Sequence, residues 1–387
     1  MLRTLSFLLG CLATVTVTVT ATGAEPRARD LGVPFEGTPG PQNAITDVAG
    51  VTVGQVTLIE DLADGRKVRT GVTAILPRGR ASMAVSVYGA SFALNGNGEL
   101  TGAAYLDELG QIDGPIVLTN THSVGIAHAA VIAWRVRAGP PDSSGYWWSS
   151  PVVAETWDGE LNDINGFHVR AEHVDRALDT ALGGPVAEGN VGGGTGMICH
   201  EFKCGIGTAS RRVEVAGTAY TVGTLVQANY GSRQTLRIAG VPISQHLPVE
   251  GDARRGDSGS IAVVMATDAP LLPHQLERIA RRGALGLGRM GSYAGNGSGD
   301  FFIAFSTANA AALSGQTLAQ STSLSNRELD PLFLATVEAT EEAIVNALVA
   351  ARDMRGNGNA FVPALPHAEL VRLLQKYGRL APPAARH

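Results

Sequence analysis

A polar segment with the sequence Gly-Asp-Ser-Gly-Ser, at residues 256–260, offers two serine nucleophiles directly before an apolar stretch. A cut between Gly259 and Ser260 would make this serine a new N-terminus that carries both a hydroxyl and a free α-amino group. An α-amine has a pKa of about 7.7–8.0, so at neutral pH it can act as general base for the hydroxyl of its own residue. Such a nucleophile needs no histidine. Taken alone, the same sequence is also typical of a turn before a strand.

Ser258, the other serine of this segment, lies in a sequence superficially similar to the serine motif of trypsin-like proteases. That motif requires a second glycine where this chain has Ser260. The upstream histidines His122 and His128 lack the Ala-Ala-His-Cys type of context that is found in that class. The long helical stretch that we expect at residues 331–352 also does not suit a double β-barrel. We therefore favour Ser260 as the nucleophile.

Strand-like and helix-like stretches are mixed along the chain around this segment. Apolar runs separated by Gly, Asn and Asp predict strands at residues 51–59, 68–76, 83–92, 116–119, 213–226, 260–265 and 301–305. Helical patterns cover residues 124–136, 169–182, 273–287 and 331–352. The mixture predicts an α/β fold of stacked helix and sheet layers. Because no long linker, charge block or internal repeat divides residues 25–387, we expect one large domain.

The composition is that of a globular protein with many tight turns. The 387 residues are 44% hydrophobic and 17% charged, which excludes a disordered polyampholyte. The 48 glycines follow no repeat, so they must punctuate turns. Lys plus Arg number 30 against 35 for Asp plus Glu, and only three are lysines, Lys67, Lys203 and Lys376. Without a basic stripe, nucleic acid is not an expected partner.

The first 24 residues have the pattern of a secretory signal peptide. Arg3 precedes an apolar run over residues 5–19, and small residues follow directly before Glu25. Threonines weaken the alternative of a membrane helix, and Cys11 is a weak hint of a lipid anchor because the apolar run continues past it. We expect cleavage near Glu25, a periplasmic or secreted protein, and no membrane association after the signal is removed.

Export would leave two cysteines, Cys199 and Cys204, in a compartment where disulfides persist. A local bridge, two free thiols and a zinc site are the alternatives. A zinc site needs more ligands at suitable spacing, and His200 is the only nearby addition. Of the three, the sequence favours two free thiols.

Several long blocks of this sequence resemble the L-aminopeptidase/D-esterase-amidase family, the self-processing serine aminopeptidases that include the β-peptidyl aminopeptidases. The blocks follow one another in order over essentially the whole of residues 25–387. They are Arg-Ala-Arg-Asp-Leu-Gly at 27–32, Asn-Ala-Ile-Thr-Asp-Val at 43–48, Thr-Asn-Thr-His-Ser-Val-Gly at 119–125, Pro-Val-Val-Ala-Glu-Thr at 151–156, Leu-Asn-Asp-Ile-Asn-Gly at 161–166, Asn-Val-Gly-Gly-Gly-Thr-Gly-Met at 190–197 and Leu-Pro-His at 365–367.

The resemblance implies a precursor that cuts itself between Gly259 and Ser260. It implies an α chain of residues 25–259 and a β chain of residues 260–387 that stay associated. The β chain begins with the nucleophile Ser260. It further implies a four-layer α/β/β/α sandwich of the type shared with ornithine acetyltransferase, and a homo-oligomer, a tetramer, of αβ units.

The same resemblance assigns roles to five further residues. Ser298 and Asp300 match the serine and the acid that support the amine and hydroxyl of the nucleophile, although relatives can carry Glu where this chain has Asp300. Asn229 matches the asparagine that stabilises the oxyanion. Trp157 stands where relatives can carry a tyrosine, so its indole is either a donor or a pocket wall. Glu155 matches the carboxylate that holds the substrate's ammonium.

The function implied is hydrolysis of the N-terminal residue from short peptides, amino acid amides and esters, with L-amino acid, D-alanine or β-amino acid substrates. One alternative is an acyltransferase of the ornithine acetyltransferase type, but this chain has neither the threonine at the cut nor the cytosolic location that would favour it. The other alternative is a non-catalytic cell-envelope binding protein. No metal or cofactor is called for. His168 and His173 do not form a metallopeptidase pair, and the glycines at residues 192–196 match no nucleotide-binding motif, so they read as a close-packed or site-lining turn.

Overall fold

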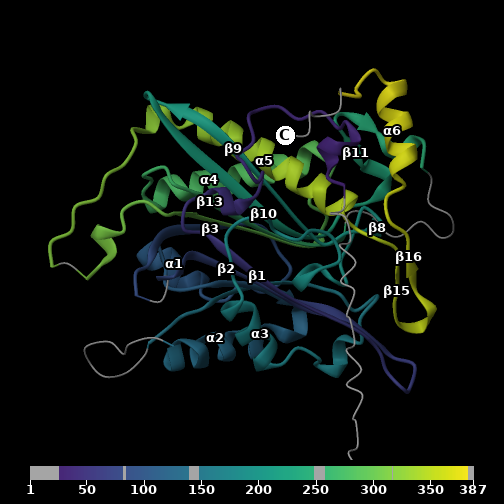
Figure 1. Cartoon of the computed structure of the whole chain (residues 1–387), viewed down its shortest axis with the longest axis horizontal. Helices are drawn as coiled ribbons and strands as arrows, with labels where there is room; N and C mark the ends of the chain where they lie inside the picture. The colour runs from purple at the N-terminus through teal and green to yellow at the C-terminus, as the bar shows by residue number, and fades with distance from the viewer. Residues whose placement is uncertain (1–25, 82–83, 139–147, 248–257, 316, 382–387) are drawn as a thin grey trace, which may run out of the picture.

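The computed structural model describes residues 26–81, 84–138, 148–247, 258–315 and 317–381 (Figure 1). Within these residues two β-sheets stack face to face, and helices cover the outer face of each sheet. The predicted α/β/β/α sandwich is therefore confirmed. The predicted signal peptide, residues 1–24, and the start of the polar segment, residues 256–257, lie outside the described residues. None of the helices in the described part of the chain is long and apolar enough to cross a membrane.

The first sheet has four strands in the order β1-β2-β5-β6. Its strands are β1 (Thr52–Asp61), β2 (Lys67–Arg80), β5 (Ile116–Asn120) and β6 (Val152–Thr156). Its outer face is covered by α2 (Val124–Ala138) and α3 (Ala171–Asp179), which lie at the bottom of Figure 1. β5 and β6 are parallel, so their carboxyl ends lie together at one edge.

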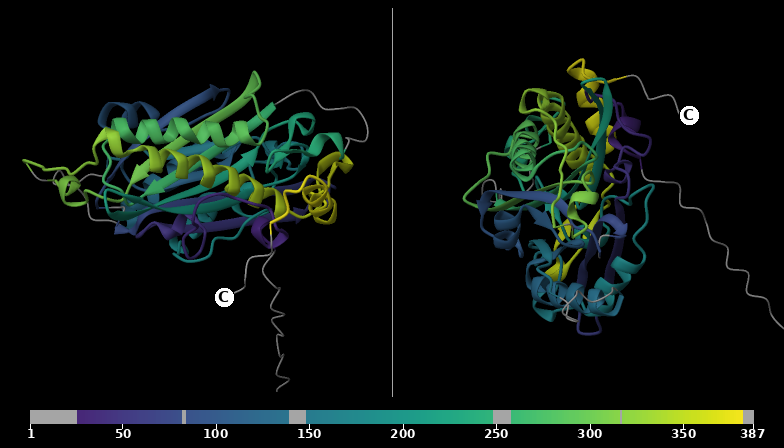
Figure 2. Two further views of the ribbon diagram at one scale, coloured as in Figure 1. Left: turned by 90° about the horizontal axis from the view of Figure 1, so that it is seen from above. Right: turned by 90° about the vertical axis from the view of Figure 1, so that its left-hand side faces the viewer.

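The second sheet has six strands in the order β4-β3-β14-β13-β10-β9. Its strands are β4 (Gln111–Ile112), β3 (Val87–Gly96), β14 (Gly297–Ser306), β13 (Ser258–Thr267), β10 (Thr218–Asn229) and β9 (Ile206–Val215). The helices α4 (Pro273–Arg289) and α5 (Asp330–Val349) lie across it, as Figure 2 shows from above. The remaining helices are α1 (Ala103–Leu109) and α6 (His367–Lys376).

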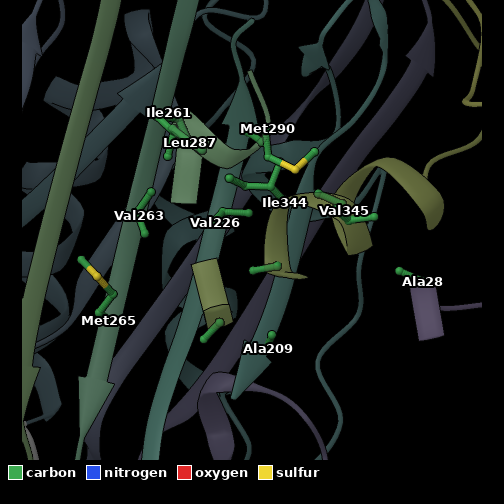
Figure 3. Close-up of a cluster of buried hydrophobic side chains, with 14 of the residues drawn as sticks. Ala28, Ala209, Val226, Ile261, Val263, Met265, Leu287, Met290, Ile344 and Val345 are labelled. Atoms are coloured by element: carbon green, nitrogen blue, oxygen red, sulfur yellow. The ribbon is translucent and has the colours of Figure 1, made fainter. Parts of the chain in front are cut away.

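Both faces of the second sheet are apolar, because helices cover one face and the first sheet covers the other. On β13, Ile261, Val263 and Met265 pack toward α4 and α5, and Figure 3 shows these side chains with Val226, Leu287 and Ile344. The alternate residues Ala262 and Val264 belong instead to the core between the sheets. This alternation follows from the pleat of a strand, and it fixes which side chains face the inter-sheet space.

The prediction of one strand at residues 213–226 is wrong, because the chain reverses within it. Ala216 and Gly217 have positive φ values of 51° and 77°, and they connect β9 to β10 in an antiparallel hairpin. A two-residue turn of this kind matches the twist of the paired strands. The strand predicted at residues 83–92 begins instead at Val87, and the expectation for Met83 lies outside the described residues.

The expectation that Cys199 and Cys204 remain free thiols is also wrong, since the structure contains a disulfide between them. The short hairpin of β7 (Ile198–Cys199) and β8 (Phe202–Lys203) reverses the chain, so the two Cα atoms lie 5.4 Å apart. That separation is within the range that a disulfide spans. The sequence separation alone did not reveal the turn.

The glycines at residues 192–196 form a close-packed turn, as predicted. A Cβ atom at Gly193 would lie 2.0 Å from the side-chain oxygen of Gln227, and one at Gly194 would lie 2.4 Å from the backbone nitrogen of Ile206. No side chain fits there, so this turn can lie directly against the core of the second sheet.

A buried carboxylate, Glu342 on α5, ties the N-terminal segment to the last long helix. Its oxygens accept hydrogen bonds from Arg29 at 2.7 and 2.8 Å, from Asn43 at 2.6 Å and from Arg211 at 2.7 Å. Burial opposes ionisation, but the arginines outweigh it and hold the pKa of Glu342 below its ordinary value. This network joins residues on opposite sides of the expected cut.

We expect Glu342→Gln to lower the free energy of unfolding by about 3 kcal/mol, because it leaves two guanidinium groups without their shared charge. The comparison is best made in a Ser260→Ala background, where the chain is expected to stay in one piece, by urea unfolding. Because the pKa is lowered in the fold, the loss should be constant above about pH 5 and shrink as the pH falls below about 4.

The control is Glu369→Gln on α6, where an exposed carboxylate pairs with Arg372 three residues away. It should leave the unfolding midpoint unchanged. An equal loss of stability in both variants would show that the network around Glu342 does not anchor the N-terminal segment.

Candidate active site

Ser260 lies near the start of β13, between two other strands of the second sheet. Its register partner on β10 is Asn229, and its partner on β14 is Gly299. The residue is buried, with 6% of its surface exposed. Because ladder contacts flank it on both sides, its position does not depend on the peptide bond that precedes it.

Gly259 adopts a backbone conformation that other residues rarely take. Its φ is +116°, and a Cβ atom here would lie 2.0 Å from the carbonyl oxygen of Asn229. Glycine is therefore required by both the dihedral angle and the space. The peptide that the sequence predicts to be cut thus follows a residue in a sparsely populated conformation, which is typical of functional backbone sites.

Asn229 faces the same side of the sheet as Ser260, because directly opposed residues in an antiparallel pair share a face. Its Oδ1 accepts a hydrogen bond from the Ile198 N–H at 2.8 Å, and its Nδ2 donates to the Trp157 carbonyl at 2.8 Å. An N–H can only donate and a carbonyl can only accept, so these partners fix the orientation of the amide. The second Nδ2 hydrogen remains for another acceptor.

Ser298 and Asp300 form a buried pair, with a 2.6 Å hydrogen bond from the Ser298 hydroxyl to Asp300 Oδ1. They point the same way, as expected for positions two apart in a strand. Ser260 pairs with Gly299, so the pleat places both neighbours on the opposite face from the Ser260 side chain. They lie beside its main chain, where the α-amine would be released. Their predicted support of the amine fits this register better than support of the hydroxyl.

Glu155 is a buried carboxylate at the carboxyl end of β6. It accepts hydrogen bonds from the Thr121 hydroxyl and, at 3.1 Å, from the Glu99 N–H. Burial raises its pKa above the ordinary value, and these two hydrogen bonds oppose the rise. An ammonium ion brought against the carboxylate would favour its charged form, as the predicted role in substrate binding requires.

A short connection joins Glu155 to the strand beside the nucleophile. A Cβ atom at Gly98 would lie 2.7 Å from Glu155 Oε1, and one at Gly299 would lie 2.5 Å from the Asn97 carbonyl. Residues 97–98 therefore lie between the carboxylate and the register partner of Ser260. The site forms where the carboxyl ends of β5 and β6 meet the start of β13 and β14.

The main-chain carbonyl of Trp157 belongs to the site, because it accepts a hydrogen bond from the Asn229 side chain. Its indole is half exposed, and it packs against Gly159, where a Cβ atom would lie 2.6 Å from Cζ2. The packing suits a pocket wall. A donor role for the indole stays a prediction.

The sequence did not assign three polar residues around the site: Thr121, which is half-buried, and Asp158 and Lys203, which are buried. Thr121 holds Glu155 and lies inside a block that the resemblance singled out. Asp158 follows Trp157 directly, and Lys203 is one of only three lysines, placed between Phe202 and a cysteine. A lysine flanked by apolar residues in a strand was the signal available for the last of these.

Ser260 lines neither of two surface cavities. One, of about 930 Å³, is lined by the N-terminal segment, residues 185–191 and residues 350–355, and none of the predicted site residues lines it. The other, of about 760 Å³, includes Gly98, Glu99 and Phe301, the neighbours of Glu155. No group of three or more His, Cys, Asp or Glu side chains within the described ranges is arranged to hold a metal ion.

Known proteins resemble this chain over nearly its whole length. The model of Peptidase family S58 matches residues 43–361. β-Peptidyl aminopeptidase BapA of Sphingosinicella microcystinivorans is 53% identical over 381 residues, covering 93% of this chain and 95% of that protein. The structure of the L-aminopeptidase D-Ala-esterase/amidase of Ochrobactrum anthropi has a TM-score of 0.87 at 49% identity, covering 92% of this chain and all of that one. A Burkholderia sp. β-aminopeptidase has a TM-score of 0.84 at 48% identity, covering 91% and 99%.

The Ochrobactrum structure is described as a variant of the Ntn (N-terminal nucleophile) hydrolase fold. The fold and these relatives define a hydrolase with an N-terminal nucleophile type of architecture. The chain belongs to peptidase family S58.

We expect Gly259→Ala to block or misdirect self-cleavage, because alanine fits neither the φ of +116° nor the 2.0 Å gap to the Asn229 carbonyl. Gly288→Ala on α4 is the matched control, since a Cβ atom there meets nothing within 4 Å. Gel electrophoresis of both purified proteins measures the cleaved fraction. Normal cleavage of Gly259→Ala would show that this backbone conformation is not needed.

Proposed function

We propose that this protein is a self-cleaving aminopeptidase whose nucleophile is the N-terminal Ser260 of the β chain. The observation that carries the proposal is made at the start of β13. There Gly259, with a positive φ of 116°, precedes Ser260, which lies directly opposite Asn229 of the neighbouring strand β10. Membership of peptidase family S58 supports it.

In self-cleavage the Ser260 hydroxyl attacks the carbonyl carbon of Gly259, and the acyl group moves from nitrogen to oxygen. Water then hydrolyses the ester, which leaves a carboxylate on Gly259 and a free amine on Ser260. In turnover that amine takes the hydroxyl proton as oxygen attacks the substrate carbonyl, and the proton passes to the leaving amine or alcohol. Water finally hydrolyses the acyl-enzyme. Asn229 stabilises the oxyanion of each step.

Glu155 gives the enzyme its exopeptidase character. Its carboxylate is buried and already oriented by Thr121 and the Glu99 N–H, so it is ready to accept an ammonium ion at little entropic cost. A substrate that presents a free amine near its scissile bond satisfies this carboxylate. Ser298 and Asp300, next to the main chain of Ser260, hold its amine in place.

The substrates are short peptides, amino acid amides and esters with a free N-terminal amine. β-Amino acid residues belong to this class, as the 53% identity to a β-peptidyl aminopeptidase supports. L-Amino acid and D-alanine derivatives belong to it too, as the likeness to the Ochrobactrum enzyme supports.

The protein acts after export, in the periplasm or outside the cell, once residues 1–24 are removed. The disulfide between Cys199 and Cys204 supports this location, because disulfides persist in oxidising compartments. The α and β chains remain together and assemble further into a homo-oligomer of αβ units. Contacts such as that of Arg29 with Glu342, which cross from one chain to the other, support the first of these associations.

We expect the 40.1 kDa chain, once residues 1–24 are removed, to appear after purification as two chains of about 24 and 13 kDa, because cleavage must release the amine that acts as the catalytic base. The smaller chain should begin Ser-Ile-Ala-Val on N-terminal sequencing. Ser260→Ala should remain one inactive chain, whereas Ser258→Ala should still be cut and active. Any other N-terminus for the smaller chain would contradict the assignment of the nucleophile.

We also expect N-acetylated substrates to fail, because the acetyl cap removes the charge and leaves the Glu155 carboxylate buried without a partner. The penalty is on the order of 3–5 kcal/mol, at least about a hundredfold in kcat/KM. Glu155→Gln should impair turnover of free-amine substrates and leave self-cleavage intact, since the precursor has no free amine at the cut. Equal kcat/KM for a peptide amide and its N-acetyl form would identify a general amidase instead.

A further inference from the structure

Lys203 is a fully buried lysine whose ammonium group lies among carbonyl oxygens. Its Nζ donates to the carbonyls of Cys204 at 2.6 Å and Met197 at 2.7 Å, with the Gly194 carbonyl at 3.4 Å. These neighbours are all acceptors, which matches the three donors of an ammonium ion and leaves no donor for the lone pair of a neutral amine. Burying a charged lysine is costly unless the charge is hydrogen-bonded or paired, as it is here by these carbonyls.

The Met197 carbonyl belongs to the same peptide group as the Ile198 N–H. On one side this peptide accepts from Lys203, and on the other side its N–H donates to Asn229 Oδ1 at 2.8 Å. A positive charge at the carbonyl polarises the peptide and strengthens the N–H as a donor. Lys203 thus acts on Asn229 through a single peptide group.

The second anchor of Asn229 directly precedes, in the chain, a buried acid that interacts with the same lysine. Asn229 Nδ2 donates to the carbonyl of Trp157, and the next residue, Asp158, is buried with its charge acting on Lys203. A Cβ atom at Gly196 would lie 2.9 Å from the Asp158 Cβ, so the two segments that hold Asn229 are packed together.

We infer that Lys203 is a positioning residue for the reaction, which orients and polarises the Asn229 amide through the Met197–Ile198 peptide. The inference rests on the proposed role of Asn229 as the oxyanion donor. With Oδ1 held by a polarised N–H, the Nδ2 hydrogen that remains is both fixed in direction and a stronger donor. The gain appears only when negative charge develops on the substrate oxygen.

Burial acts against the charged forms of both Lys203 and Asp158. Burial lowers the pKa of Lys203 well below its ordinary value, and the charge of Asp158 opposes that shift. Burial likewise raises the pKa of Asp158 to about 7, against hydrogen bonds from Thr70, Asn162 and Asn120. The carbonyls around Nζ and the charge of Asp158 oppose this effect of burial and favour the ammonium form on which the inference depends.

The test replaces Lys203 by methionine, which keeps the length of the side chain and removes its charge and donors. We expect kcat, referred to the concentration of cleaved chain, to fall about tenfold and KM to change by less than about twofold. Lys376→Met on α6, an exposed lysine, is the matched control and should match the wild type. A change in KM with kcat preserved would overturn the inference.

A double-mutant cycle with Asn229→Ala separates positioning from a general structural role. Asn229→Ala alone should lower kcat about 10²–10³-fold, and adding Lys203→Met should cost less than about twofold more. Losses that multiply in the double variant would overturn the role of Lys203 and leave that of Asn229 standing. A normal kcat in Asn229→Ala would instead remove the oxyanion role on which both statements rest.

If Lys203→Met does not fold, Asp158→Asn tests the same inference with Lys203 left in place. Without the carboxylate the pKa of Lys203 falls further, so the ammonium is lost at lower pH. We expect the alkaline limb of the kcat profile to move to lower pH than in the wild type. Both proteins have the same Ser260 amine, so the titration of that amine cannot account for a difference between them. An unchanged alkaline limb of the kcat profile would contradict a role for the Lys203 ammonium.

Discussion

The structure depends on the pairing of the first residues of β13 with a strand on each side. A nucleophile that is also a chain terminus has no preceding residue to hold it, so neighbouring strands must supply that restraint. β10 and β14 do so through the register of Ser260 with Asn229 and Gly299. The same register brings Asn229, the proposed oxyanion donor, to one face of the sheet beside Ser260 and the Ser298–Asp300 pair to the other face.

The proposed cut before Ser260 is tolerable because the contacts that hold the fold run between the two resulting chains. β13 lies in the middle of its sheet, with apolar residues packed on both faces, and β10 of the α chain pairs with it directly. Glu342 of α5 adds a buried charge that binds Arg29 and Arg211 from the other chain. Loss of one peptide bond removes none of these contacts.

The polar groups of the site are oriented mainly by main-chain groups. Asn229 lies between an N–H and a carbonyl, Lys203 lies among carbonyls, and Glu155 accepts from an N–H as well as from Thr121. Main-chain groups are fixed by the fold and lose little freedom when they bind. The polar groups of the site are therefore oriented before a substrate binds. Such preorganised groups stabilise the charge of a transition state strongly, because they need not reorient during the reaction.

The sequence by itself determined the mixed α/β class and the nucleophile candidate from local pattern, and it predicted the layer order and the candidate site residues from blocks shared with a family. Ser260 before an apolar strand and Ser298 two residues from Asp300 are readable as spacing. What stayed hidden depends on chain reversals and on contacts between distant segments. The turn at Ala216 split a predicted strand, and the hairpin around His200 joined two cysteines that we expected to be free.

Only the tertiary structure decided which face of the sheet each side chain occupies and which partner each buried polar group finds. Residues 97–98, 157–158 and 197–198 approach the site from three separate parts of the chain, and nothing in their spacing predicts that meeting. The task of Lys203 was invisible for the same reason. A lysine's role is set by the groups that surround its charge, and those groups are assembled by packing rather than by sequence order.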